Sequence, residues 1–229
     1  MKIGIICAVP LELEPFLPLI KNSHTTTRAM LTFYQGEIIQ VPVVATFCGV
    51  GKTNATIATQ ILIDTYGATH IINSGTAGGM CTSLNIFDTV INTEAVNHDV
   101  EDGVLTGISH WIPSIYFKSC EKLLSQAKTA VANLQLQNTT HYGRMVTGDK
   151  FIENEGRDQI IQAFSPLSVD METASIAHVC FVYGVPYLAI RTITDTALDS
   201  GTNSFAQNCP AASIISKNIV VEMLEHFVA

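Results

Sequence analysis

The sequence predicts an α/β fold, a three-layer sandwich in which a mixed, largely parallel sheet lies between two layers of helices. Short runs rich in β-branched residues alternate with longer segments of helical periodicity, the pattern of a parallel sheet with crossover helices. Strand-like pieces near the N-terminus fit a meander, which makes the sheet mixed. The chain has 229 residues, 47% of them hydrophobic, and no linker or repeat, so we expect one domain over residues 1–229.

The first expected strand is residues 2–8, KIGIICA. Glu12 and Glu14 follow at once without a small-residue cleavage site, which favours a buried strand over a secretory signal. No apolar run reaches the length of a membrane span. The meander is expected at residues 25–40, its strand-like pieces joined by Gln-Gly-Glu at 35–37. The other strands are expected at residues 41–47, 69–74, 88–96, 143–148, 167–171 and 187–194.

The expected helices are residues 53–66, 117–134, 155–163, 172–183 and 211–226. Residues 97–116 have the least pattern and are interpreted as a mobile or subunit-contacting loop. Apolar residues that look exposed cluster at its end: Trp111, Ile112, Ile115, Tyr116 and Phe117. Because such a patch is rarely left in water, we expect a homodimer whose interface includes part of residues 97–117.

Composition narrows the class of protein. Charged residues make up only 14%, against roughly 25% in an average soluble domain, which also favours an oligomer. A net charge of -8 without any basic run argues against a nucleic-acid partner. The six cysteines lack Cys-x-x-Cys spacing and lie mostly in apolar runs, so we expect free core thiols, no structural zinc and a cytoplasmic location.

Polar residues follow several of the expected strands. In open α/β sheets ligands bind off the carboxyl ends of the strands, so these residues should meet at one rim. Each also has a plainer interpretation: Glu12 as a solvated carboxylate, Glu172 as a first-turn acid, Asp195 as an N-cap and Phe151 as a core side chain. The residues that follow a strand are Glu12, Gly49, Gly51, Thr76, Phe151, Met171, Glu172, Thr194 and Asp195.

Several other kinds of site are excluded. The stretch FCGVGKTN at 47–54 looks like the end of a P-loop, but Thr46 stands where the first glycine is needed, so a packing turn is favoured and a P-loop NTPase is excluded. The histidines show no His-x-x-x-His or triad-like context, and there is no Gly-x-Ser-x-Gly elbow. What remains is a carboxylate site without metal, cofactor or nucleophilic side chain.

Six segments together carry a resemblance to a known family: KIGIICAVPLELEPF, CGVGKTNA, IINSGTAGG, TGDKFI, VDMETASIAHVC and RTITDTA. They are similar to the 5'-methylthioadenosine/S-adenosylhomocysteine nucleosidases of the nucleoside phosphorylase superfamily, in order and from residue 1 to about 226. The resemblance implies a nucleoside phosphorylase-like fold. It also implies hydrolysis of an N-glycosidic bond to adenine and a 5-thioribose product, without a cofactor.

The resemblance also implies roles for individual residues. Glu12 would be the base that activates water, and Asp195 the acid that protonates adenine N7. Arg191, Thr76 and Gly78 would complete the surroundings of the water and the acid.

Five further positions would bind the substrate. Met171 and Glu172 would line the ribose, with the Glu172 carboxylate accepting from its hydroxyls. Phe151 would stack on the purine, and the backbone of Ile152 would contact its edge. Val50 would lie near the 5' substituent.

Three departures from the family pattern are visible. Thr76 stands where serine is more usual, and Val9 and Val50 are smaller than the commoner Met and Ile. Residues 97–117 keep the His-Asp-Val start but lack the Gly-Gln and Pro-Gly pattern of the loop that reaches the neighbouring subunit's site. The resemblance therefore leaves specificity at the 5' end of the nucleoside open.

Phosphate is not expected to be the nucleophile. A phosphorylase of this superfamily would present arginine after the first strand, where this chain has Glu12 and Glu14. We therefore expect hydrolysis of 5'-thioadenosine nucleosides. The alternatives are a nucleosidase or phosphorylase of different specificity, of futalosine or purine nucleoside type, and a nucleoside-binding sensor without turnover.

Overall fold

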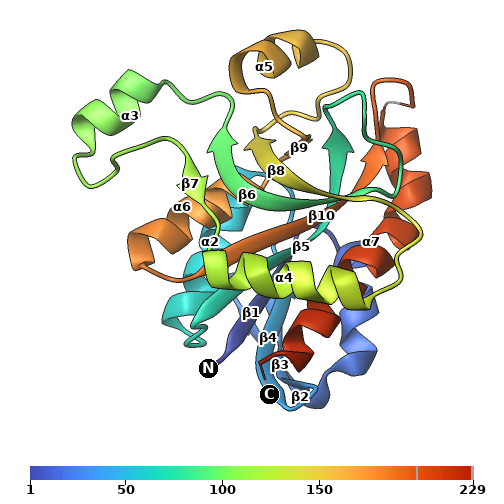
Figure 1. Ribbon diagram of the computed structural model, residues 1–229. Coiled ribbons are helices and arrows are strands. Elements are labelled where there is room, and N and C mark those ends of the chain that lie inside the picture. Colours follow the sequence, from blue (N-terminus) through green and yellow to red (C-terminus); the bar gives the residue numbers. More distant parts are fainter. Residues whose placement is uncertain (200, 228–229) are drawn as a thin grey trace.

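The computed structural model describes residues 1–199 and 201–227, and in these residues ten strands form one mixed sheet with helices on both faces (Figure 1). The strands are β1 (Ile3–Cys7), β2 (Lys21–Arg28), β3 (Leu31–Ile38), β4 (Val41–Phe47), β5 (His70–Gly79), β6 (Thr89–Asn97), β7 (Phe117–Lys118), β8 (Thr140–Thr147), β9 (Ser168–Asp170) and β10 (Tyr187–Asp195). The helices are α1 (Pro10–Leu13), the 3₁₀ helix η1 (Glu14–Leu19), α2 (Lys52–Asp64), α3 (Asp102–Ile108), α4 (Glu121–Asn133), α5 (Arg157–Phe164), α6 (Thr173–Tyr183) and α7 (Thr202–Glu225). The predicted α/β class with a mixed sheet is confirmed.

The sheet closes partly on itself around β5. Its strands run in the order β10-β6-β8-β9-β5-β1-β4-β3-β2, and β10 also pairs with β5. β4, β1, β5 and β10 are parallel neighbours, while β6 joins β10 and β9 joins β5 in antiparallel register. β5 therefore has β1 and β10 beside it and β9 at its carboxyl end, where Gly78 pairs with both Val169 and Asp195.

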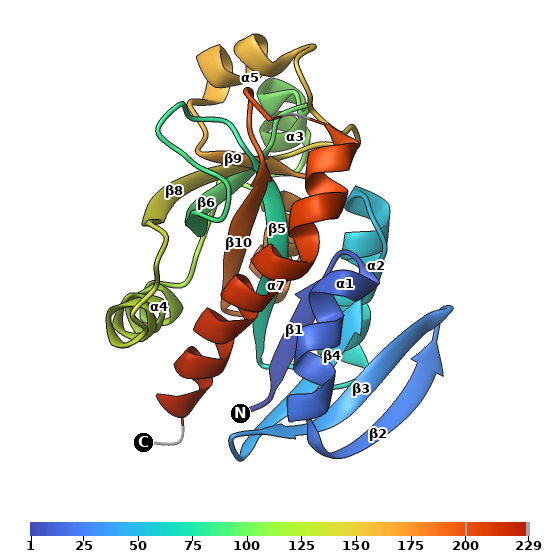
Figure 2. The same ribbon diagram turned by 90° about the vertical axis from the view of Figure 1, so that its right-hand side faces the viewer.

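Alternating side chains of the strands build a core on each face of the sheet. Ile6 and Ile71 face the layer of α2 and α6, whereas their neighbours Ile5 and Ile72 face α1, α4 and α7. Figure 2 shows α7 running along the outside of β10 and β5. Strands apolar on both faces are what a sheet covered by two helical layers requires.

The N-terminal meander is confirmed, but its turns were placed wrongly. Residues 35–37 lie inside β3, and the tight turns are Ala29-Met30 and Ile39-Gln40. All four turn residues have positive φ, as two-residue hairpin turns require. None of them is Gly, Asn or Asp, so the usual sequence signal of such a turn is missing.

Two helix boundaries were also wrong. Residues 117–118 form the short strand β7 beside β6, and the helix expected from 117 begins only at Glu121. α7 begins at Thr202 rather than at 211 and runs through Pro210. A proline lacks the N–H that a helix interior uses, so the pattern favours a start after it, yet the packed helix continues across it.

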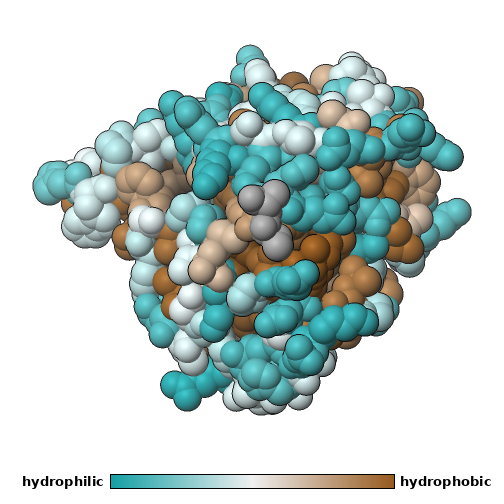
Figure 3. Space-filling model, turned by 60° about the horizontal axis from the view of Figure 1, so that its bottom comes forward, coloured by the Kyte–Doolittle hydropathy of each residue, from teal (hydrophilic) through white to brown (hydrophobic). Residues whose placement is uncertain are grey.

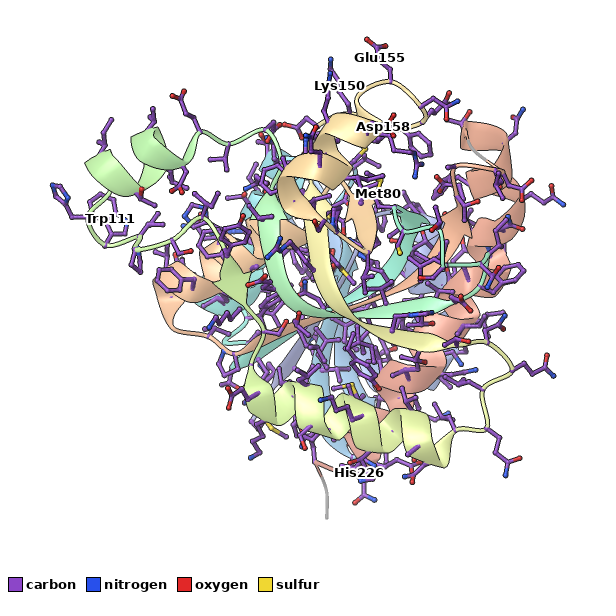
Figure 4. All side chains as sticks on the ribbon, turned by 45° about the horizontal axis from the view of Figure 1, so that its top comes forward. Met80, Trp111, Lys150, Glu155, Asp158 and His226 are labelled. Atoms are coloured by element: carbon purple, nitrogen blue, oxygen red, sulfur yellow. The ribbon has the colours of Figure 1, made fainter. Side chains whose placement is uncertain are left out.

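Residues 97–116 are not wholly irregular, since they contain α3. This helix has no buried residue and stands away from the sheet (Figure 1). Trp111, on the segment after α3, is 68% exposed and lies at the outer edge of the molecule in Figure 4. The expected exposure of Ile112, Ile115 and Phe117 is wrong, because these side chains are buried in the protomer's own core.

Figure 3 shows the face at the bottom of Figure 1, where hydrophilic side chains predominate around a hydrophobic area near the centre. None of the helices that the structure describes combines the length and hydropathy needed to span a bilayer.

Candidate active site

A cavity of about 200 Å³ opens at the carboxyl ends of β1, β5, β9 and β10. This is the edge at which the strand pattern placed the site. Ten residues singled out from the sequence all line the cavity: Glu12, Val50, Thr76, Gly78, Phe151, Ile152, Met171, Glu172, Arg191 and Asp195. Their roles in binding and catalysis stay predictions, but their gathering in one cavity is observed.

Glu12 lies in α1, the short helix that follows β1, and its carboxylate is held in place by hydrogen bonds. Its side chain is 2% exposed, and both carboxylate oxygens accept hydrogen bonds. The N–H and Oγ1 of Thr76 donate to Oε1 at 2.7 and 2.8 Å, and the N–H groups of Ala8 and Val9 donate to Oε2 at 2.7 and 3.3 Å. A Cβ on Gly75 would lie 2.5 Å from this carboxylate, so β5 needs glycine there. The solvated-loop interpretation of Glu12 does not hold.

Arg191 lies fully buried between three carboxylates. Its guanidinium nitrogens are 3.6 Å from Glu12, 3.3 Å from Asp170 and 3.2 Å from Glu172. These neighbours raise the pKa of Arg191 above its ordinary value although burial acts in the opposite direction. One cation among three acids leaves a surplus of negative charge beside the cavity.

Asp170 is a site residue that the sequence argument missed. It accepts hydrogen bonds from Thr147 Oγ1 at 2.6 Å and from the N–H groups of Glu172 and Thr173 at 3.2 and 3.0 Å. It thereby fixes the chain where β9 passes into α6. The sequence feature that could have indicated Asp170 is its position near the end of the expected strand 167–171, two residues before Glu172.

Glu172 binds the glycine turn that looked like a phosphate loop. The N–H of Gly51 donates to its Oε1 at 3.0 Å, and Arg191 donates to its Oε2 at 3.2 Å. The adjacent Lys52 N–H donates to Asp149 at 2.9 Å, and the Lys52 ammonium pairs with Asp99 at 2.6 Å. The donors that a P-loop offers to phosphate are thus bound by protein carboxylates.

Burial shifts the protonation of Glu172. Desolvation raises the pKa of this carboxyl to about 7, although Arg191 lowers it. Nearby Asp170 and Glu12 add to the rise through their negative charge. As the N-cap of α6, Glu172 makes no side-chain capping bond, so its side chain serves the cavity rather than the helix.

Asp195 is the last residue of β10, and only one of its two carboxyl oxygens has a hydrogen-bond partner among the described residues. It is 2% exposed, Thr194 Oγ1 donates to its Oδ1 at 3.0 Å, and Oδ2 has no hydrogen-bond partner among the described residues. Burial raises the pKa of this carboxyl, which favours the protonated acid. The N-cap of α7 is Gly201, so Asp195 is not the helix cap that its sequence position allowed.

Aromatic and apolar side chains form the rest of the wall. Phe151 is 40% exposed at the cavity, not core, and its ring lies edge-on to Phe205 at 6.3 Å between centroids. Phe205 and Thr202 were missed because the expected helix began at 211, beyond the first turns of α7. Lys150 also lines the cavity, and in Figure 4 its side chain points outward at the rim.

Comparison with known proteins agrees with this geometry. Residues 2–225 match the family model described as the phosphorylase superfamily. The 5'-methylthioadenosine/S-adenosylhomocysteine nucleosidase of Pseudoalteromonas translucida is 35% identical over 236 residues, covering 100% of this chain and 99% of that one. The chain belongs to this nucleosidase family of the phosphorylase superfamily. The resemblance recognised from the six motifs is confirmed.

Solved structures of the superfamily share the fold. The nucleosidase of Neisseria meningitidis in complex with methylthio-immucillin-A has a TM-score of 0.90 and 28% identity, covering 98% of this chain and 99% of that one. Futalosine hydrolase of Helicobacter pylori has a TM-score of 0.88 and 26% identity, with 99% and 98% covered. Proteins that share this fold thus carry the names of different substrates.

Proposed function

We propose that this protein hydrolyses the N-glycosidic bond of 5'-methylthioadenosine and S-adenosylhomocysteine, giving adenine and the corresponding 5-thioribose product. One observation carries the proposal: a fixed carboxylate, Glu12, and a buried acid with an unpartnered oxygen, Asp195, face the same cavity along β5. The full-length nucleosidase relatives support the choice of substrate.

The two acids are spaced to act on opposite ends of the breaking bond. Glu12 lies against Gly75 and Asp195 against Gly78, three residues apart and thus about 10 Å along an extended strand. This spacing along β5 leaves room for a ribose ring between the two side chains. This arrangement resembles that of glycosidases that admit a water opposite the leaving group.

Glu12, Asp195 and one water molecule account for every bond and proton in the proposed reaction. Asp195 gives its proton to adenine N7 while the bond from the ribose C1' to N9 breaks and its electron pair stays on the purine. Water attacks C1' from the other side and gives a proton to Glu12. General acid and base assistance of this kind contributes about 10²- to 10⁴-fold each.

The remaining cavity residues bind and orient the nucleoside. Phe151 stacks on the purine and the backbone of Ile152 contacts its edge, while Met171 and Glu172 hold the ribose. The surplus of negative charge around Arg191 favours the positive charge that develops on the ring. The same surplus disfavours phosphate, because like charges about 4 Å apart repel by roughly 4 kcal/mol at an effective dielectric of 20.

A futalosine-type substrate is the second candidate, supported by the likeness to futalosine hydrolase. Four full-length curated relatives at 34% to 36% identity are all named 5'-methylthioadenosine/S-adenosylhomocysteine nucleosidase, which favours the first. Adenine or hypoxanthine release from methylthioadenosine, adenosylhomocysteine and futalosine, compared by kcat/KM, separates the two. A higher kcat/KM for futalosine than for both adenosine nucleosides would reverse the assignment.

We further propose that the chain works in the cytoplasm as a homodimer and folds as one domain over residues 1–229. The exposed Ile108 and Trp111 on and after α3 support an interface there. Continuous pairing of the sheet from β2 to β10, with core on both faces, supports the single domain.

A further inference from the structure

Arg157 is a buried cation that the proposed reaction does not use. It is the first residue of α5 and only 5% exposed. Arg191, the other arginine buried among the described residues, is surrounded by three carboxylates. Arg157 forms no ion pair with any described carboxylate. Burying a charge without a counter-charge destabilises the folded state, so we looked for a functional role of Arg157.

The guanidinium of Arg157 ties two segments of the site together. Its Nε donates to the carbonyl of Glu153 at 2.6 Å, and its Nη2 is 3.4 Å from the carbonyl of Ile152. Its Nη1 donates to the carbonyl of Gly79 at 2.6 Å, at the end of β5. The first two residues belong to the segment that carries the purine-contacting backbone, and the third lies beside the acid.

Only arginine supplies this set of bonds. The planar guanidinium has donors fixed at several angles, whereas a lysine ammonium is a compact point charge at the end of a flexible stem. Gly156, the N-cap of α5, has a φ of 79°, a left-handed conformation that lets the chain turn at this point. The local backbone is therefore shaped to bring Arg157 inward.

The charge of Arg157 also acts on Asp195. Gly79 follows Gly78, and a Cβ on Gly78 would lie 2.9 Å from Asp195 Oδ2. Burial raises the pKa of Asp195 and lowers the pKa of Arg157, and the opposite charge of each group acts against this shift in the other.

Few other charges face Asp195. Glu153, on the segment before α5, raises its pKa. Gly78 of β5 and Val169 of β9, which lie beside Asp195, are neutral, as are Ser204 and Asn208 of α7, which donate to the carbonyl of Thr194. Arg157 is thus the cation acting on the acid.

We propose that Arg157 is a positioning residue that fastens the purine-binding segment to β5 and balances the charge of Asp195 once that acid has given up its proton. This inference rests on the proposed function. The proton passes from Asp195 to purine N7, leaving a carboxylate in a buried site. Arg157 forms no bond to substrate and loses no proton. Its positive charge stabilises the carboxylate across the backbone of Gly78 and Gly79.

Three variants test the two parts of this role. Arg157→Met removes both the charge and the hydrogen-bond donors. Arg157→Lys keeps the charge but lacks the planar set of guanidinium donors. Arg144→Met is the matched control, since Arg144 is a partly buried arginine that pairs with Glu94 and donates to the carbonyl of Phe164 at the far end of α5. The carboxyl titration of Asp195 is followed by ¹³C NMR without substrate, assigned with Asp195→Asn, and adenine affinity is measured by calorimetry.

In Arg157→Met we expect the titration midpoint of Asp195 to rise by about one pH unit, the low end for loss of a nearby opposite charge. In Arg157→Lys the midpoint should stay near the wild-type value while adenine binds roughly tenfold or more weakly, because the purine segment is less well held. Arg144→Met should change neither quantity. An unchanged midpoint in Arg157→Met, or an equal shift in Arg144→Met, would overturn the proposal.

Arg157→Lys carries the test if Arg157→Met does not fold. Adenine affinity equal to that of the wild type, or a midpoint moved by a full unit, would then contradict the proposal. Neither measurement needs turnover. Failure of the wild-type protein to release a base from any nucleoside would refute the proposed function, while the midpoints still decide the role of Arg157.

Discussion

Replacing Glu172 by glutamine should stabilise the protein and disable it at the same time. Glu172 is one of three carboxylates around Arg191, and burial raises its pKa from an ordinary 4.5 to about 7. Folding therefore favours its protonated form, which the neutral amide imitates. Arg191 keeps two carboxylate partners in the variant, so no buried cation is stranded.

The size and sign of the stability effect follow from this pKa. A rise from 4.5 to about 7 corresponds to about 3 kcal/mol of unfavourable free energy for the ionised group in the fold, as an order of magnitude. Below pH 4.5 the group is protonated in both states and this destabilisation is absent. As the pH rises through 7 the folded state must ionise it, so the stability present at low pH is lost.

Thermal unfolding at pH 5 and pH 8 measures the effect. Glu172→Gln should gain little over the wild type at pH 5 and up to about 3 kcal/mol at pH 8, or roughly 6 to 12 °C in Tm for a chain of this size. Glu155→Gln, an acid exposed at the top of Figure 4, is the control and should leave the pH dependence unchanged.

The same variant should lose activity, because an amide replaces the ionised acceptor for the ribose hydroxyls. The expected loss in kcat/KM is about 10- to 150-fold, from about 1.5 to 3 kcal/mol for a charge-assisted hydrogen bond. A variant that is less stable than the wild type at pH 8, or that keeps near-normal kcat/KM, would refute this account of Glu172.

Three further predictions concern the acid, the base and the interface. Asp195→Asn should bind adenine within about tenfold of the wild type and lose at least 10²- to 10⁴-fold in single-turnover adenine release; retention of a tenth of the wild-type rate would remove its role as acid. Gly75→Ala should displace Glu12, since its Cβ would lie 2.5 Å from the carboxylate, and should cost at least about 100-fold in kcat. Gly103→Ala, where a Cβ meets nothing within 4 Å, is its control, and equal effects of the two would contradict the reasoning. Sedimentation should show a dimer at micromolar concentration that Trp111→Ser weakens, whereas a stable wild-type monomer would count against the interface.

The sequence alone predicted most strands and helices, and it predicted that the site residues meet at one edge of the sheet. The strands β1 and β10 are buried over their whole length, and parallel strands end at one edge, so the polar residues that follow them meet there. This is why the strand pattern alone was enough to place Glu12, Glu172 and Asp195 around one cavity. Their individual roles depended on the family resemblance.

The remaining features depend on tertiary contacts that no local pattern records. Phe205 was missed because Pro210 hides the first turns of α7, which the packing against β10 and β5 nevertheless keeps helical. Asp170 and Arg157 look like ordinary polar residues in the sequence. Their importance comes from partners far along the chain, Arg191 and the carbonyl of Gly79.

The most direct test of the account is the fate of methylthioadenosine in phosphate-free buffer. The account predicts release of adenine together with free 5-methylthioribose, at a rate that added phosphate does not raise. In ¹⁸O-labelled water the label should enter the sugar product, because water is the nucleophile. A sugar 1-phosphate as the main product, or adenine release only when phosphate is present, would contradict it.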